Sequence, residues 1–227
     1  MTTITKGGRP GSRGEPEKTR AAILKSALEE FAHEGVAGAR TDEIARRAGV
    51  NKALLYYYFK DKDGLYAAAL EQVFSGLHDH VVPVLDDTRV PAKQRLLNYV
   101  AAHFDYIASS PVYPRLVQRE FMRSAGKKLS PVASRILERY GKPIYMKLTA
   151  LIRHGVEQGE FRDLDPQQTL TSILGTIVFY FISLPAQQVM APGDPASPER
   201  IAARRAAVQE FVAAAVFAPT GGKGAQR

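Results

Sequence analysis

Lys52, Ala53 and Tyr57 have side chains suited to reading the edges of DNA bases. A lysine can donate hydrogen bonds to guanine O6 or N7, and an alanine can lie against a thymine methyl group. Tyr57 follows Ala53 by four residues, so both project from the same side of a helix, and the tyrosine could reach a base or a phosphate. Such contacts need an exposed helix that fits the major groove, so the neighbouring residues must supply one.

The segment 41–65 predicts two short helices joined by a tight turn, which is the pattern of a helix-turn-helix. Thr41 is expected to cap the first helix, because its hydroxyl can accept from a free backbone N–H of the first turn. Gly49 can take the left-handed conformation that ends a helix. Asn51 is then expected to cap the second helix, which would enter the groove.

Residues 17–34 are expected to form a third helix that covers this pair. Its apolar residues repeat at helical spacing and so share one face: Ile23, Leu24, Ala27, Leu28 and Phe31. Gly35 follows and is expected to end the helix. The three predicted helices together make a compact DNA-binding unit.

The segment from Arg20 to Leu65 contains an ordered series of motifs without gaps. They are Ile23-Leu24-x-x-Ala27, Phe31-Ala32-x-x-Gly35, Thr41-x-x-Ile44-Ala45-x-x-Ala48-Gly49-Val50, Leu55-Tyr56-Tyr57-x-Phe59 and Lys62-x-x-Leu65. This series resembles the DNA-binding domain of the tetracycline-repressor (TetR) family of bacterial transcription regulators. Three residues depart from the family pattern: Ala53 replaces a frequent glycine, Leu54 a frequent threonine and Tyr58 a frequent histidine. The first two lie near the DNA in this family, so they affect contacts rather than the fold.

The resemblance implies that Tyr56 hydrogen-bonds the DNA backbone, a contact that sets register rather than sequence preference. Thr41 and the amides at the start of its helix suit a phosphate, and Lys62 suits another. The residues expected to contact DNA are therefore Thr41, Asn51, Lys52, Ala53, Tyr56, Tyr57 and Lys62. The alternative for the tyrosine run is a place in the core of a small domain, which we expect for Tyr58.

The remaining sequence predicts helices only, because no run shows strand alternation with hairpin turns. Helices are expected over 63–82 and 92–108, and from 114 onward. Three more are expected to begin at Ser130-Pro131, Asp165-Pro166 and Ser197-Pro198, where a capping residue precedes a proline at the first helical position. Pro83 and the Asp86-Asp87-Thr88 cluster are expected to end the first of these helices, and Pro143 is expected to kink the one that begins after Ser130. The predicted fold class is all-α.

The chain is expected to divide into four parts: a disordered basic arm (1–16), the helix-turn-helix domain (17–62), a larger helical domain (63–217) and a flexible tail (218–227). The resemblance implies that the larger domain binds a small ligand and forms a homodimer. The arm carries Lys6, Arg9 and Arg13, which could add phosphate or minor-groove contacts. It could equally be an inert tail.

The last two predicted helices, Gln167–Leu184 and Pro198–Phe217, are expected to pack against their symmetry mates in a four-helix interface. The apolar residues proposed for it are Ile173, Ile177, Phe181, Leu184, Ile201, Val208, Val212 and Val216. The alternative is that they belong to the core of a single chain. The apolar run 173–184 has 12 residues, whereas a membrane-spanning helix needs about 20, so we expect no membrane segment.

Polar and aromatic residues on the helices that should surround a ligand cavity are His78, His103, Phe104, Phe121, Tyr140, Tyr145, Met146, Phe179 and Tyr180. Each could instead be an ordinary core residue. The segment Arg115–Lys147 is rich in basic residues and so hints at an acidic ligand, such as a carboxylate or an acyl thioester. The aromatic residues nearby would suit a planar hydrophobic molecule equally well.

Composition limits the other classes of function. The net charge of +8 favours a polyanionic partner such as nucleic acid. Cysteine is absent, which excludes disulfides, thiolate metal clusters and thiol redox sensors. His78 and His80 face different directions on a helix, so no metal site is expected there. The N-terminus lacks an apolar signal core, and we expect a cytoplasmic protein.

The sequence has no Walker loop, dinucleotide fingerprint, zincin motif or nucleophile elbow, so neither catalysis nor a cofactor is expected. It predicts a ligand-responsive transcription regulator: a homodimeric repressor that a small-molecule inducer releases from a palindromic operator in double-stranded DNA. The alternative is a DNA-binding activator or an architectural protein without a small-molecule ligand. The large second domain argues against pure architecture, for which a short dimerisation helix would suffice.

Overall fold

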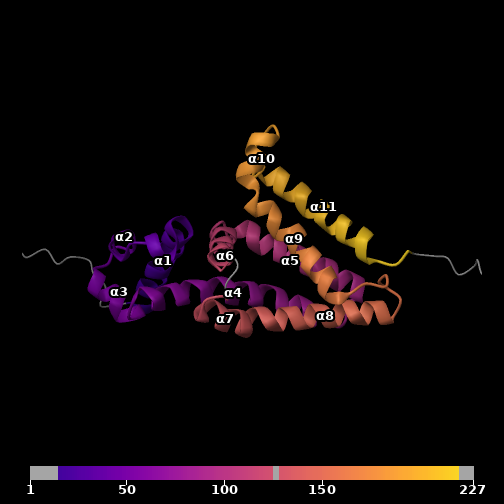
Figure 1. Cartoon of the computed structure of the whole chain (residues 1–227), viewed down its shortest axis with the longest axis horizontal. Helices are drawn as coiled ribbons and strands as arrows, with labels where there is room; N and C mark the ends of the chain where they lie inside the picture. The colour runs from indigo at the N-terminus through magenta and orange to yellow at the C-terminus, as the bar shows by residue number, and fades with distance from the viewer. Residues whose placement is uncertain (1–14, 125–127, 220–227) are drawn as a thin grey trace, which may run out of the picture. The chain divides into compact units, whose positions relative to one another are not determined.

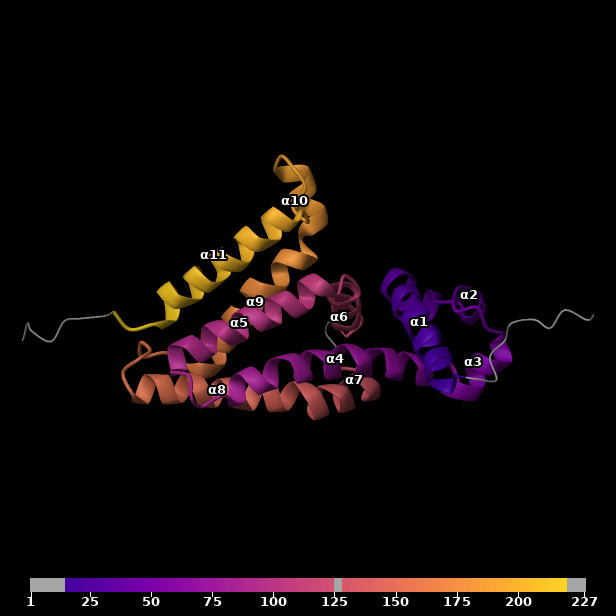
Figure 2. The ribbon, with the colours of Figure 1, turned by 180° about the vertical axis from the view of Figure 1, so that it is seen from behind.

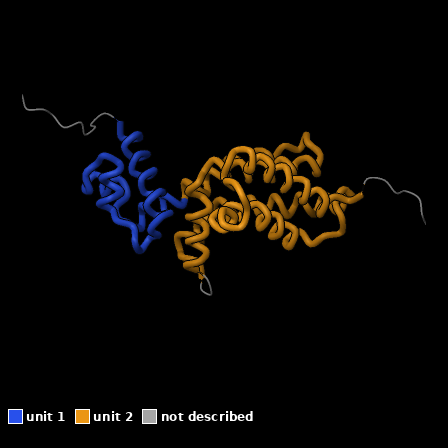
Figure 3. Tube along the Cα trace, turned by 90° about the horizontal axis from the view of Figure 1, so that it is seen from above, with its two compact units in different colours: residues 1–70 blue, residues 71–227 orange. Residues whose placement is uncertain are grey.

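The computed structural model describes residues 15–124 and 128–219, and in these ranges all regular secondary structure is helical apart from one isolated bridge between Phe161 and Phe217. The predicted all-α fold is confirmed. The chain divides into two compact units, Met1–Leu70 and Glu71–Arg227 (Figure 3). Nearly all of the predicted arm 1–16, and most of the predicted tail 218–227, lie outside the described residues.

The first unit contains α1 (Pro16–Gly38), α2 (Thr41–Arg47), α3 (Lys52–Phe59) and the beginning of α4 (Lys62–Asp86) (Figure 1). Its core is formed by residues with no exposed surface, which come from all four helices: Ile23, Phe31, Ile44, Leu55 and Leu65. The ring of Tyr66 on α4 meets the ring of Phe31 edge-on, with 5.1 Å between centroids. The first turns of α4 therefore complete the core of the helix-turn-helix unit.

The helix ends in this unit follow local signals, with one exception. Gly49 has a positive φ angle of 69°, which fits its predicted role as the terminator of α2. Gly35, with φ 68°, interrupts the helical backbone as predicted, but it lies inside α1, which continues to Gly38. Asn51 caps α3 as predicted, because its side chain accepts the Leu54 N–H at 2.7 Å. The cap predicted at Thr41 is wrong: Arg40 occupies the cap position, and the Thr41 hydroxyl instead shares a hydrogen bond with the Tyr56 hydroxyl on α3.

The described residues of the second unit form the rest of α4 and seven further α-helices. They are α5 (Ala92–Ser109), α6 (Val112–Arg123), α7 (Pro131–Ile136), α8 (Lys142–Glu157), α9 (Pro166–Ile182), α10 (Leu184–Met190) and α11 (Pro198–Val216). α5 contacts α8, α9 and α11 and supplies the fully buried Tyr99 and Phe104 (Figure 2). α4 runs beside the α7–α8 segment, where Glu71 pairs with Arg139 and Asp86 pairs with Lys147.

Three predicted helix starts in this unit are confirmed. The side chains of Ser130, Asp165 and Ser197 accept the backbone N–H of Ala133, Gln168 and Arg200, respectively. At Pro143 the chain does deviate from a regular α-helix, because a π-helical turn, Leu137–Gly141, separates α7 from α8. A proline has no amide hydrogen to donate, so this deviation fits its position just inside α8.

The end predicted for α4 is wrong in one part. Pro83 does not end the helix, which continues to Asp86, the first residue of the Asp86-Asp87-Thr88 cluster. Val81 and Leu85, on either side of the proline, are buried, so packing of the helix outweighs the missing hydrogen bond.

The apolar residues proposed for the dimer interface mostly lie inside one chain, so that prediction is wrong for them. Ile173, Ile177, Phe181, Val208, Val212 and Val216 are buried, while Leu184 and Ile201 are half-buried. The reason is that α9 packs on α5, α8 and α11, and α11 packs on α5 and α9, so these side chains are directed inward. Among the described residues, no single helix is long and apolar enough to cross a membrane; only α9 and α10 together meet that test, as a pair bent by 66°.

Candidate DNA-binding surface and ligand cavity

α3 presents a polar and aromatic face to solvent and an apolar face to the core. Leu55 and Phe59 are buried, four residues apart, which fixes the rotation of the helix. Ala53 and Tyr57 are exposed, and Tyr57 has 79% of its surface accessible. A tyrosine so exposed contributes little to packing, so it is available for contact with another molecule.

Lys52 is also exposed, but its ammonium group already has a partner. Its Nζ lies 2.5 Å from Oδ1 of Asp42 on α2. The hydrogen bond from Lys52 lowers the pKa of the Asp42 carboxyl and raises the pKa of the lysine. The lysine must therefore leave an acidic neighbour, or share it, before it can reach a base edge.

The other residues expected to contact DNA lie close by and make local hydrogen bonds. The Thr41 hydroxyl is 3.2 Å from the hydroxyl of Tyr56, which is 37% exposed, whereas Thr41 itself is buried. The side-chain oxygen of Asn51 accepts from the backbone, which leaves its amide hydrogens free to donate. Lys62 donates to the carbonyl of Ala37 at 3.1 Å, so its charge is held at the end of α1.

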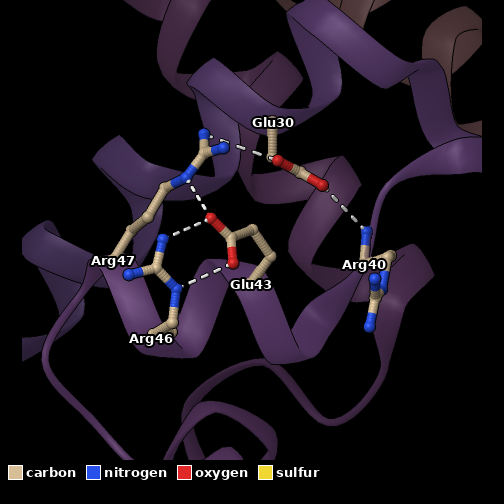
Figure 4. A network of polar contacts seen from close by, with 5 residues as sticks. All are labelled: Glu30, Arg40, Glu43, Arg46 and Arg47. Atoms are coloured by element: carbon tan, nitrogen blue, oxygen red, sulfur yellow. Dashed lines mark hydrogen bonds and ion pairs between the residues drawn. The ribbon is translucent and has the colours of Figure 1, made fainter.

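A network of two carboxylates and three arginines holds α2 against α1 (Figure 4). Glu30 on α1 is buried, accepts the Arg40 N–H at 3.1 Å and lies 3.5 Å from the Arg47 guanidinium. Glu43 on α2 accepts hydrogen bonds from Arg46 and Arg47, which lower its pKa to about 2. This network fixes the position of α2, on which the orientation of Thr41 and Asp42 depends.

The second unit contains a cavity of about 820 Å³ that is partly open to solvent and has a mainly apolar lining. Side chains from α4, α5, α6, the α7–α8 segment and α9 line it, among them Phe74, Leu77, Val117, Leu148 and Val178. A volume of this size is in the range of sites that bind drug-sized molecules. The lining includes one acidic and one basic residue, Glu138 and Lys142, and both are exposed.

Polar groups are buried at one part of this lining. His103 on α5 is 3% exposed, and its Nδ1 lies 2.8 Å from the hydroxyl of Tyr99. Burial lowers the pKa of His103 to about 4, and burial raises the pKa of Tyr99 and of the neighbouring Tyr113. All three residues line the cavity and are uncharged near neutral pH.

Three of the nine residues expected to bind a ligand, His103, Phe121 and Tyr145, line this cavity. The other six are not among its lining residues. Phe104 is buried against Phe181, Tyr180 donates to the Pro195 carbonyl, and Tyr140 donates to Glu71 and lies against the His78 ring. Met146 and Phe179 are exposed by 60% and 69%.

Comparison with known proteins gives matches over both units. Residues 23–69 match the bacterial regulatory proteins of the tetR family, and residues 93–212 match the tetracyclin repressor-like C-terminal domain. The HTH-type transcriptional repressor SCO4008 of Streptomyces coelicolor is 34% identical over 179 residues, which are 79% of this chain and 86% of that protein. The chain belongs to the TetR family.

Two further proteins that this chain resembles are informative. The HTH-type transcriptional activator FasR of Mycolicibacterium smegmatis is 38% identical over 111 residues, 49% of this chain and 50% of that protein. A regulator from Saccharomonospora viridis, whose crystal structure is in complex with choline, has the same fold, with a TM-score of 0.68 at 21% identity over 89% of this chain and 99% of that one. TetR-family proteins are DNA-binding transcription regulators and not enzymes, and this chain is one of them.

Most lining residues of this TetR-family chain were missed by sequence reasoning, among them the two buried tyrosines beside His103, Tyr99 and Tyr113. Tyr99 precedes His103 by four residues, a spacing at which two side chains on one helix face meet. That spacing could have paired the tyrosine with the histidine. Tyr113 gave no comparable signal, because it reaches the cavity only through the packing of α6 on its neighbours.

Proposed function

We propose that this protein is a homodimeric repressor that leaves its operator when a small molecule fills the cavity of the second unit. The observation that carries the proposal is the course of α4. Its first turns complete the core of the helix-turn-helix unit through Tyr66, and it then lines the cavity through Phe74 and Leu77. A ligand that displaces these side chains therefore acts on the helix that continues directly from the DNA-binding unit.

On DNA, α3 is the recognition helix. Ala53, Tyr57 and Lys52 face the bases, while Tyr56, held by Thr41, contacts a phosphate; Asn51 and Lys62 add backbone contacts. A dimer places two such helices in successive major grooves of a palindromic site, about one helical turn apart. A protein with this activity works where the chromosome is, so we place it in the bacterial cytoplasm.

The dimer forms through an outer surface of α9 and α11, which we define by the exposed Phe179 and Phe211 and the exposed alanines of α11. Those alanines are spread over the part of the helix that faces away from its buried valines: Ala202, Ala203, Ala206, Ala207, Ala214 and Ala215. Small side chains let a second helix approach closely, and exposed phenylalanines beside them leave apolar area to bury. This outer surface replaces the inward-facing residues that sequence reasoning had proposed.

Ligand control requires two states of the protein that differ in the position of α4. The ligand must bind one of these states more tightly than the other. The two states then differ in the separation of the two recognition helices, and only one of them fits the operator. A structure of the same fold in complex with choline supports the capacity of this fold to hold a small molecule. The cavity of this chain supports it directly.

The test is selection of duplexes from a random DNA pool by the purified protein, followed by a salt titration of the selected sequences. A palindromic consensus whose affinity falls steeply with salt is expected for a dimer that contacts many phosphates. If the selected duplexes share no sequence, the proposal that the protein regulates specific sites would be contradicted. Screening compounds for release of the selected duplex then tests ligand control.

An activator is the second candidate, because the relative FasR is a transcriptional activator. Transcription in vitro from a promoter that carries the selected site separates the two. A repressor lowers the yield of transcript when it is added, and an activator raises it. An architectural protein without a ligand would bend or bridge DNA and would leave both yields unchanged.

A further inference from the structure

The cavity of the second unit contains one buried polar atom without a partner among the described residues, Nε2 of His103. The residue is 3% exposed and lines the cavity together with Tyr99 and Tyr113. Burying a nitrogen without a hydrogen bond costs free energy, and native proteins rarely accept this cost outside functional sites. Nε2 has less than 1 Å² of accessible surface, so the side chains around it must shift slightly before a bound molecule can reach it. Since the lining is mainly apolar, a group on that molecule is the partner that Nε2 then finds.

The hydrogen bond at the other ring nitrogen decides whether Nε2 donates or accepts. The Tyr99 hydroxyl is fully buried and lies 2.8 Å from His103 Nδ1. If the hydroxyl donates to Nδ1, its hydrogen is satisfied and Nε2 carries the imidazole hydrogen. The opposite tautomer would leave the hydroxyl hydrogen buried without an acceptor in the described part of the chain. The first arrangement satisfies more groups, so Nε2 is a donor.

The lining also limits the charge of the group that meets this donor. Burial keeps the imidazole uncharged, with its pKa lowered to about 4. Glu138 and Lys142, the charged residues of the lining, are exposed and therefore solvated. A carboxylate or an ammonium at His103 would be desolvated with no opposite charge beside it, which is far more costly than burying a carbonyl oxygen.

We propose that the cavity binds an uncharged, mainly apolar ligand that places a hydrogen-bond acceptor, of the ketone, ester or ether type, against Nε2 of His103. This inference rests on the proposed function and specifies the chemistry of its ligand. It disfavours the acidic group to which the basic segment Arg115–Lys147 had pointed. An acyl compound could still bind, provided that an uncharged oxygen lies at the histidine.

The first test measures binding to the full-length protein by calorimetry, with no DNA present. The probes form two sets of equal skeleton: decan-2-one, decane and decanoate, and cyclododecanone with cyclododecane. In at least one set the ketone is expected to bind about tenfold tighter than its hydrocarbon, as one net hydrogen bond provides, and decanoate is expected to bind more weakly than decan-2-one. Ketone binding no tighter than hydrocarbon binding in both sets would overturn the proposal.

Variants then locate the contact. His103→Phe keeps an aromatic ring and removes the donor, so it is expected to abolish the ketone preference while retaining hydrocarbon binding. His103→Gln supplies a new donor and is expected to restore part of the preference. Tyr140→Phe removes a hydroxyl outside the cavity and serves as the control for folding. A ketone preference that survives in His103→Phe would assign the contact elsewhere and refute the role of His103.

A spectroscopic test does not depend on the choice of probe. In protein labelled with ¹⁵N at its five histidines, the His103 signals are expected to show a protonated Nε2 and an unprotonated Nδ1. A protonated Nδ1, or a charged ring at neutral pH, would contradict the donor assignment. Ketone binding that depends on His103 but releases no operator DNA would leave this inference standing and would refute only the proposed ligand control.

Discussion

At the scale of single residues, Lys52 and Tyr56 lie four positions apart on α3 but are expected to affect DNA binding differently. Lys52→Ala removes a donor to base edges, so the preference for the consensus over a mutated site should fall roughly tenfold to a hundredfold. Tyr56→Phe removes a phosphate contact and should weaken both sites alike. Titration of the consensus and the mutated duplex with each variant measures the ratio of the two affinities. An unchanged ratio in Lys52→Ala would show that another side chain reads the bases.

Asp42 is expected to restrain DNA binding, because its carboxylate holds Lys52 Nζ at 2.5 Å. Asp42→Asn removes a negative charge that faces the DNA and frees the lysine. Affinity for any duplex should rise roughly two- to fivefold, the usual range for an exposed ion pair. Equilibrium titration at low and moderate salt measures it. Asp63→Asn, an exposed carboxylate in the first turn of α4, is the control, and an equal gain there would indicate a general charge effect.

His103 is expected to make the fold sensitive to acid. Its pKa is lowered to about 4 in the folded chain, against an ordinary value of 6.5, so between these pH values only the unfolded chain binds the proton. The free energy of unfolding therefore falls as the pH falls through this window, by about 2 to 3 kcal/mol at pH ~4.5. His103→Gln should lose this part of the pH dependence.

Urea unfolding of both proteins at pH ~7.5 and ~4.5, at one fixed concentration of protein, measures the difference. Carboxylates also titrate in this range, but they contribute equally to both proteins and cancel in the comparison. His154→Gln, on the exposed side of α8, is the control for the loss of one imidazole. Identical pH profiles for wild type and His103→Gln would show that the histidine is not buried as described.

At the scale of helices, the sequence predicted starts better than ends. Asn51, Ser130, Asp165 and Ser197 accept a backbone N–H three residues on, and such caps are local, so they can be recognised from a few residues. Pro83 is the opposite case. Whether a helix continues through a proline depends on what its flanking residues bury, and that is decided by distant segments of the chain.

The cavity was predicted only in part for the same reason. Periodicity shows that a helix has an apolar side, but it does not show whether that side meets another helix or a cavity. Phe104 and His103 are neighbours on α5, and both were proposed as ligand residues. Phe104 packs on Phe181, whereas His103 lines the cavity, because successive residues of a helix point about 100° apart.

Replacing Pro83 by alanine is expected to stabilise α4. The alanine restores a backbone hydrogen bond within the helix, and the gain is reduced by the greater flexibility of the unfolded chain. The free energy of unfolding should rise by about 1 to 2 kcal/mol, measured by urea titration. Pro198→Ala, in the first turn of α11 where proline is tolerated, should lower it slightly. A loss of stability in Pro83→Ala would show that the ring itself fills an essential space.

At the scale of the whole molecule, assembly is expected to depend on the outer surface of α9 and α11. Phe211 is 60% exposed in the single chain, and Phe211→Glu places a charge among the alanines of α11. The variant should be monomeric by light scattering and should lose most of its affinity for a palindromic site. Met122→Glu, equally exposed on α6, is the control. A Phe211→Glu protein that remains dimeric would place the interface elsewhere.

The boundary between the two compact units lies inside α4, between Leu70 and Glu71, rather than in a loop. A fragment that ends at residue 62, where the sequence had placed the boundary, would lack Leu65, Tyr66, Ala69 and Leu70, all of which are buried. An excised DNA-binding domain must therefore keep the first two turns of this helix to fold. For the same reason, a protease under native conditions should find no cleavable linker between the two halves of the chain.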